Sequence, residues 1–133
     1  MIEVKNIVKK FGEQTVLKGI STRFEAGMTN LIIGQSGSGK TVFLKSLLGI
    51  HTPDSGTISF DGRIYSELSN DERRELRTEI GMVFQGSALF DSMTVEENIG
   101  FPLKMFTNKS AKEIKERVDF VIDRVHLVNA DRK

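Results

Sequence analysis

The 133-residue sequence has no cysteine, which excludes disulfides, thiolate metal sites and a cysteine nucleophile and fits a reducing compartment. Charge of neither sign predominates, because the 19 Lys and Arg residues nearly balance the 18 Asp and Glu residues and the net charge is +1. This balance gives no overall field toward nucleic acid, so any anion site must be local. No stretch approaches the roughly 18 consecutive apolar residues of a membrane span, and charged residues interrupt the N-terminal segment where a secretory signal needs an apolar core. We therefore expect a cytoplasmic protein that binds no nucleic acid and has no membrane span of its own.

The apolar residues, 38% of the total, are enough for one compact domain that buries roughly two thirds of its unfolded surface. Residues 1–30 alternate loosely between apolar and polar side chains, which predicts two or three short antiparallel strands. Residues 57–60 predict another strand, and the Asp61-Gly62 pair after it is a hairpin signal. The runs Leu31–Ile33 and Gly81–Phe84 do not alternate and predict strands covered on both faces, as in a parallel sheet between helices.

Helix signals occur at three places. From Gly39 to about Leu48 the apolar residues have helical spacing. Ser69 and Ser110 are each followed three residues later by Glu, and such capping boxes predict helices that begin at these points. The last of the three helices carries an apolar stripe formed by Ile114, Val118, Val121, Ile122 and Val125. Residues 86–106 are rich in apolar side chains but have no steady period, so no element is predicted there.

The octapeptide GQSGSGKT, Gly34–Thr41, fits the pattern G-x-x-x-x-G-K-[ST]. A glycine-rich loop of this kind bares successive backbone N–H groups around a polyphosphate, and the helix that follows adds the partial positive charge of its N-terminus. Lys40 would then reach the outer phosphates, and the hydroxyl of Thr41 would ligate Mg²⁺. The alternative is a flexible Gly/Ser loop that matches the motif by chance. A strand-like run precedes the octapeptide and a helix-like run follows it, as the phosphate-binding motif requires. The sequence therefore predicts a nucleoside phosphate site.

Four stretches together resemble a known family: KKFG near the start, the octapeptide, PDSGTISFDG after its helix, and GMVFQ with LFDSMTVEENIGFPL downstream. They are similar to the ATP-binding subunit of ABC transporters over essentially the whole chain. The last stretch looks most like the Mla-type (mammalian-cell-entry) subfamily, which transports lipids. The resemblance implies that ATP hydrolysis at such a subunit drives transport, here of phospholipid, from the cytoplasmic face of the inner or plasma membrane.

The resemblance also implies an α/β fold, that of a P-loop NTPase of ABC type, within one partial ATP-binding domain. Residues 1–30 would form its N-terminal antiparallel β subdomain, and residues 31–88 would be a portion of the RecA-like core. Residues 89–133 would form the Q-loop region and the start of the helical subdomain.

Site residues are carried over by position. Phe11 matches the aromatic residue that stacks on adenine, with Val16 packing alongside; without the family, Phe11 would be read as an ordinary strand end. Gln85 matches the Q-loop glutamine, whose amide oxygen would ligate Mg²⁺ and hold the attacking water, so Lys40 and Gln85 are the expected catalytic residues. The expected nucleotide-binding set is Phe11, Val16, Gly34, Gln35, Ser36, Gly37, Ser38, Gly39, Lys40, Thr41 and Val42, and the expected metal ligands are Thr41 and Gln85.

Two macromolecular partners are implied by the resemblance. The segment from Gln85 to Phe106 would receive a transmembrane permease subunit, although several of its apolar residues could equally pack under a long loop. A second copy of the ATP-binding subunit would complete the ATP site. His51 and His126 have no second ligand at metal spacing and are read as ordinary surface or boundary residues.

The sequence departs from the family in lacking several motifs that the resemblance would imply. An LSGGQ-type signature, the aspartate and catalytic glutamate after the next core strand, and the switch histidine are all expected beyond residue 133. We therefore expect a fragment of a longer subunit that binds ATP without steady hydrolysis, with apolar strand edges left unpaired. A small P-loop kinase is the remaining alternative. The strand and hairpin segments on either side of the helix that follows the glycine-rich loop argue against it.

Overall fold

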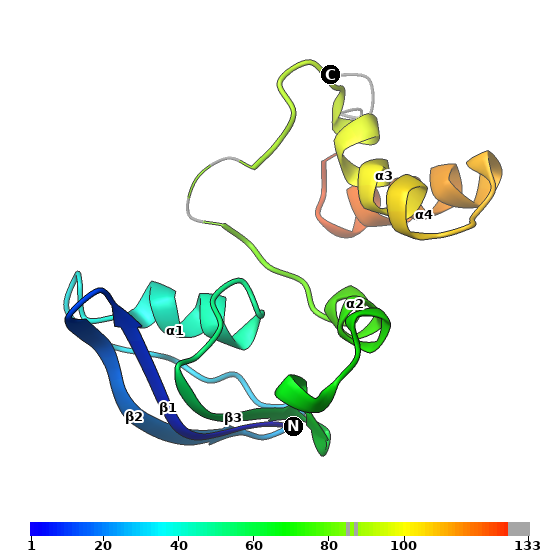
Figure 1. The fold of residues 1–133 in the computed structure, drawn as a ribbon. Helices are drawn as coiled ribbons and strands as arrows, with labels where there is room; N and C mark the ends of the chain where they lie inside the picture. The colour runs from blue at the N-terminus through cyan, green and yellow to red at the C-terminus, as the bar shows by residue number, and fades with distance from the viewer. Residues whose placement is uncertain (85, 87, 128–133) are drawn as a thin grey trace. The chain divides into compact units, whose positions relative to one another are not determined.

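The computed structural model describes residues 1–84, 86 and 88–127, and its chain divides into two compact units, residues 1–82 and 83–133 (Figure 1). Gln85, a predicted metal ligand and catalytic residue, lies outside the described residues. None of the helices that the structure describes is long and apolar enough to cross a membrane.

The first unit is built on one antiparallel sheet. Strands β1 (Ile2–Phe11) and β2 (Gln14–Phe24) form a long hairpin, β3 (Ser55–Phe60) pairs with the other edge of β1, and the short β4 (Arg63–Ile64) completes the order β2-β1-β3-β4 (Figure 1). The antiparallel strands predicted at the N-terminus and at residues 57–60 are confirmed. So is the Asp61-Gly62 hairpin, in which both turn residues have a positive φ, 49° and 82°.

A bulge in β1 sets which residues enter the core. Val4 and Ile7 are both buried although they are three positions apart, a spacing that a regular strand would place on opposite faces. The register with β2 shifts between them, and Asn6 adopts a left-handed φ of 51°. The Asn6 backbone N–H donates to Ser21 Oγ at 2.9 Å, which holds the bulge against β2.

The core of this unit lies between the sheet and helix α1 (Lys40–Leu47), with contributions from α2 (Asn70–Thr78). A single 3-10 turn, η1 (Tyr65–Glu67), connects the sheet to α2. The buried apolar residues of this core are Val4, Ile7, Leu17, Phe43, Leu47, Ile58, Phe60 and Leu76. The predicted helix after the glycine-rich loop is confirmed.

The second unit contains two helices that pack together, α3 (Val95–Phe106) and α4 (Ala111–Arg124). Gly100 of α3 is buried at their contact, where a Cβ would lie only 3.2 Å from Ile114 Cγ2 and 3.5 Å from Val118 Cγ2. The helices approach this closely because glycine adds no side chain. Val118 and Ile122 of the predicted stripe are buried, whereas Val125, just past the helix, is exposed.

Helix α3 was not predicted from the sequence. Gly100 and Pro102 both lie inside it, and both lower helix propensity. The signal that could have found it is Thr94 followed by Glu97: the Glu97 backbone N–H donates to Thr94 Oγ1 at 3.2 Å, and the Thr94 N–H donates to Glu97 Oε2 at 3.1 Å. The same reciprocal bonds open α2 at Ser69 and α4 at Ser110, as predicted.

The predicted buried strands at Leu31–Ile33 and Gly81–Phe84 are wrong for this structure. Neither run is a strand, and Leu31, Ile33 and Val83 are 82%, 84% and 96% exposed. A strand of a parallel sheet needs hydrogen-bonding neighbours, and the sheet formed by the described residues is entirely antiparallel. Without pairing partners among the described strands, these runs have no regular secondary structure.

Candidate nucleotide-binding site

The glycine-rich loop joins residues 31–33 to α1 and needs glycine at two points. Gly37 and Gly39 have φ values of 81° and 97°, in the left-handed region that other residues adopt at a cost. Gly39 is the N-cap of α1, and the Ser38 N–H donates to the Gln35 carbonyl at 3.1 Å to close a turn between them. The loop therefore turns into the helix through main-chain geometry alone.

The N-terminus of α1 is open. No side chain caps it and no acidic residue lies in its first turn, whereas α2, α3 and α4 each begin with a capping box. The first bond along the helix is from Phe43 N–H to Gly39 O at 2.9 Å, so the N–H groups of Lys40, Thr41 and Val42 precede the helical ladder. Uncapped N–H groups and the helix dipole together favour an anion at this point.

Lys40 folds back across this loop. Its ammonium donates a hydrogen bond to the carbonyl oxygen of Gly34, at the opposite end of the octapeptide. At Gly34 itself a Cβ would lie 2.5 Å from Ser38 Oγ and 3.6 Å from Lys40 Cδ, so a side chain there would displace that of Ser38. The cation is thus held over the main chain of the loop, where a bound phosphate would meet it.

The hairpin that carries Phe11 and Val16 packs directly on the loop. A Cβ at Gly39 would lie 3.1 Å from Val16 Cγ1 and 3.2 Å from Leu17 Cδ2, so β2 contacts the main chain at the start of α1. Phe11 ends β1 and pairs with Gln14 across the two-residue turn. The structure therefore places both residues predicted to hold adenine in the same unit as the phosphate loop.

Mg²⁺ would find few protein ligands here. Within the described residues no group of three or more His, Asp or Glu side chains is arranged to hold a metal. The hydroxyl of Thr41 is exposed in the first turn of α1. This donor set fits an ion that is held mainly by the phosphates of its nucleotide, because Mg²⁺ at such sites takes one or two protein ligands and keeps several waters.

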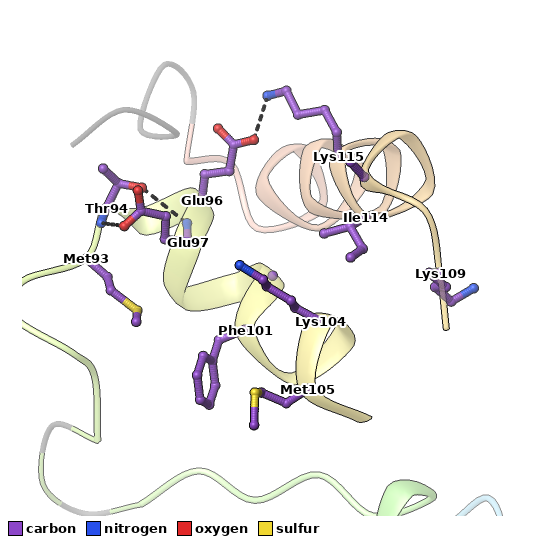
Figure 2. Close-up of a pocket in the computed structure, with 12 residues that line it drawn as sticks. Met93, Thr94, Glu96, Glu97, Phe101, Lys104, Met105, Lys109, Ile114 and Lys115 are labelled. Carbon is purple, nitrogen blue, oxygen red and sulfur yellow. Dashed lines mark hydrogen bonds and ion pairs between the residues drawn. The ribbon is translucent and has the colours of Figure 1, made fainter. Parts of the chain in front are cut away.

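The second unit contains a groove of about 1000 Å³ between α3 and the start of α4 (Figure 2). Met93, Phe101 and Met105 line it and point to one side, while Lys115 Nζ joins Glu96 Oε1 across the two helices at 3.4 Å. Hydrogen bonds to Asp119 and then Glu96 raise the pKa of Lys115. The lining of the groove overlaps residues 85–106, the segment predicted to receive a permease subunit.

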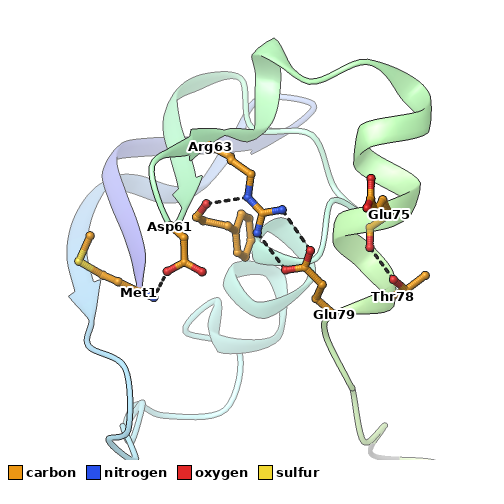
Figure 3. Close-up of polar contacts among 7 residues, drawn as sticks. Met1, Asp61, Arg63, Glu75, Thr78 and Glu79 are labelled. Atoms are coloured by element: carbon orange, nitrogen blue, oxygen red, sulfur yellow. Dashed lines mark hydrogen bonds and ion pairs between the residues drawn. The ribbon is translucent and has the colours of Figure 1, made fainter.

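Polar groups around β4, in the first unit, serve the fold. The guanidinium of Arg63 donates two hydrogen bonds to Glu79, at 3.1 and 2.9 Å, and joins β4 to the residue that ends α2 (Figure 3). The hydrogen bond from Arg63 lowers the pKa of Glu79. The terminal ammonium of Met1 likewise bonds Asp61 at 2.6 Å and lowers its pKa. These groups are paired with one another, so they offer no ligand site.

A family model described as ABC transporter matches residues 17–133. The chain belongs to the ABC transporter family. It is 41% identical over 127 residues to a probable ribonucleotide transport ATP-binding protein, mkl, of Mycobacterium leprae (strain TN), covering 96% of this chain and 36% of that protein. It is 38% identical over 134 residues to the chloroplastic protein TRIGALACTOSYLDIACYLGLYCEROL 3 of Arabidopsis thaliana, covering all of this chain and 38% of the relative.

Solved ABC structures have the same fold. The dimeric ATP-binding cassette MJ0796 in a post-hydrolysis state bound to ADP and Pi superposes with a TM-score of 0.85 at 30% identity, covering all of this chain and 61% of that one. CbiO1 of Clostridium perfringens, part of the transporter complex cbiONQ, also gives 0.85, at 29% identity over 99% of this chain and 53% of its own. The predicted ABC-type α/β fold is confirmed, and the chain spans about a third of the length of the curated relatives it matches.

Within this ABC chain, two residues beside Phe11 were not predicted to take part in the site. Lys9 Nζ lies 5.2 Å from the centroid of the Phe11 ring, and the His51 ring lies 5.3 Å from it. No local signal links His51 to Phe11, because the contact depends on how the segment after α1 returns to the sheet. Lys9, two residues before Phe11, could have been found from the side-chain alternation of a strand.

Proposed function

We propose that this chain binds Mg²⁺–ATP at Gly34–Thr41 and acts as the ATP-binding subunit of an ABC transporter. The open N-terminus of α1 carries the proposal: it alone among the α-helices of the described residues begins without a side-chain cap, and its loop presents main-chain N–H groups instead. Such a terminus stabilises the negative charge of a polyphosphate. The family match supports ATP as the nucleotide.

Each part of the loop then has a role. The ammonium of Lys40 leaves the Gly34 carbonyl and bonds the outer phosphates. N–H groups of residues 35–42, apart from the Ser38 N–H that bonds the Gln35 carbonyl, surround the phosphate chain. Thr41 contributes its hydroxyl to Mg²⁺, with Gln85 as a second ligand. Mg²⁺ bound with the nucleotide supplies neutralisation of phosphate charge. The ring of Phe11 stacks on adenine and Val16 packs beside it.

Hydrolysis of ATP needs more groups than the phosphate-binding loop provides. Phosphoryl transfer requires a positioned water and charge stabilisation on both sides of the transferred group. In our proposal Lys40 stabilises the phosphates and Gln85 orients the water, while the remaining groups come from outside these 133 residues and from a second copy of the subunit. The 133-residue chain therefore binds ATP without sustained turnover.

We further propose that a transmembrane permease docks on the segment from Gln85 to Phe106, at the cytoplasmic face of the membrane, and that the transported substrate is a phospholipid. The groove in which Met93, Phe101 and Met105 lie among charged side chains supports the docking surface. The resemblance of LFDSMTVEENIGFPL to the Mla-type subfamily supports phospholipid as the substrate. Similarity to a relative whose name refers to trigalactosyldiacylglycerol, a galactolipid, supports only a lipid of some kind. Other relatives are named for ribonucleotide or for spermidine and putrescine transport.

The binding proposal is tested by comparing ATP with AMP, both with Mg²⁺, in calorimetric titrations of the unaltered chain. AMP keeps the base and ribose but lacks the outer phosphates that Lys40 and the loop contact. We expect ATP to bind at least about a hundredfold more tightly, since two or more charge-assisted hydrogen bonds are lost at roughly 1.5–3 kcal/mol each. Equal affinities would refute a phosphate site at this loop.

The turnover proposal is tested by measuring phosphate release from Mg²⁺–ATP. We expect the 133-residue chain to release phosphate at the background rate, and the same chain extended by its native downstream sequence to turn over, because the missing water-activating groups are then supplied. A Lys40→Ala version of the extended chain is the matched control. Full turnover by the 133-residue chain would overturn this part of the proposal.

A further inference from the structure

The ring of Phe11 has two close neighbours, Lys9 and His51. Lys9 Nζ lies 5.2 Å from its centroid as a cation over the ring, and the His51 ring meets it at 5.3 Å with 78° between the planes. Neither contact encloses the ring. Phe11 accordingly remains 43% exposed. Part of its surface is thus still available to a ligand.

The position of His51 is fixed from the helix side. The N–H groups of Ile50 and His51 both donate to the Lys45 carbonyl, at 2.9 and 3.2 Å, so the chain turns tightly off the end of α1. Gly49, with a φ of 72°, permits this turn. His51 is half-buried and belongs to the same continuous segment as the phosphate loop and its helix.

The same segment is also fixed from the sheet side. Lys9 Nζ donates to the Thr52 carbonyl at 2.9 Å, Asp54 N–H donates to the Val8 carbonyl at 2.8 Å, and Lys10 N–H donates to Asp54 Oδ2 at 2.7 Å. Three hydrogen bonds therefore bind residues 52–54 to the last residues of β1. His51 is held against Phe11 by both the helix and the sheet.

We propose that His51 is a positioning residue for base recognition, which acts by fixing the ring of Phe11 in the orientation that stacks on a purine base. This inference rests on the proposed function, since it assumes a nucleotide at the loop. A phenylalanine at a hairpin end has side-chain freedom in solvent that it must lose when a base stacks on it, and a ring already ordered loses less. His51 thus raises the affinity for the base and leaves the affinity for the phosphates unchanged.

This separation of base and phosphate provides the experiment. Inorganic tripolyphosphate has the phosphate chain without a base, so a residue that acts through Phe11 affects ATP alone. We titrate both ligands, with Mg²⁺, against the unaltered chain and the variants His51→Ala, His51→Phe, Phe11→Ala and His51→Ala combined with Phe11→Ala. Lys40→Ala serves as the variant that acts on the phosphates.

We expect His51→Ala to weaken ATP about threefold to tenfold, the range of an aromatic pair, with tripolyphosphate unchanged. His51→Phe keeps the edge contact and should restore ATP affinity. In the Phe11→Ala background His51→Ala should have no further effect, since the ring through which it acts is gone. Equal weakening of both ligands, no effect on ATP, or additive losses would each overturn the positioning role. If the unaltered chain binds neither ligand, or Lys40→Ala binds both normally, the phosphate site itself is refuted and the inference falls with it.

Discussion

Replacement of Lys40 by alanine is expected to lower the affinity for Mg²⁺–ATP by roughly thirtyfold to several hundredfold, the equivalent of about 2–4 kcal/mol. The ammonium is the loop's one side-chain cation, and it lies over the main chain that would surround the phosphates, bonded to the Gly34 carbonyl. Without it, the N–H groups and the helix dipole still attract the anion but no longer with a full positive charge. Calorimetric titration of ATP measures the change.

The control for this variant is Lys18→Ala, which removes one positive charge from an exposed position of β2. Because the two variants have the same net charge, a difference between them reports on position. We expect Lys18→Ala to bind ATP as the unaltered chain does, and circular dichroism of both variants to match that of the parent. If Lys40→Ala retained the parent affinity, the assignment of the phosphate loop would be wrong.

The second large effect concerns stability, at Gly56 in β3. Its φ is 90°, and a Cβ there would lie 2.4 Å from the Asn6 carbonyl oxygen and 2.5 Å from that of Lys5. These atoms are backbone at the β1 bulge, so they cannot rotate away, and β1 and β3 must separate. We expect Gly56→Ala to lower the free energy of unfolding by about 2–5 kcal/mol, combining a left-handed residue with a steric clash.

Gly62→Ala is the matched control, because Gly62 has a similar φ of 82° but nothing within 4 Å of its Cβ position. It should lose only the conformational cost of a left-handed alanine, about 1 kcal/mol. Urea unfolding followed by the fluorescence of Tyr65, the single tyrosine, reports on the unit that contains both glycines. Equal destabilisation by the two substitutions would show that the close approach of β1 and β3 at Gly56 is not real.

Local signals were sufficient for much of this fold. The hairpin at Asp61-Gly62 and the helices that begin after Ser69 and Ser110 depend on residues within three or four positions of one another, and all were predicted. Helix α3 has the same kind of signal at Thr94, but Gly100 and Pro102 obscured its periodicity. In each of these cases the residues that form the signal lie within four positions of one another.

Features that depend on distant residues were not predictable in the same way. Leu31–Ile33 has the composition of a buried strand, yet whether it forms one depends on which strands are present to pair with it. The contact between His51 and Phe11 depends on the hydrogen bonds that join residues 52–54 to β1. The loop itself could be predicted, because its glycines, lysine and threonine are contiguous, but its closeness to Val16 could not.

The uncapped first turn of α1 has a consequence for folding as well as for binding. Gly39 at the N-cap position offers no side-chain acceptor, which costs the helix roughly a few tenths of a kcal/mol relative to serine or threonine, and a bound anion would accept hydrogen bonds from the first-turn N–H groups in place of such a cap. In the proposed complex the triphosphate would do for α1 what serine and threonine do for α2, α3 and α4. Since a ligand stabilises the folded state in proportion to the logarithm of its concentration, the supply of nucleotide would help to decide how much of this protein is folded at any moment.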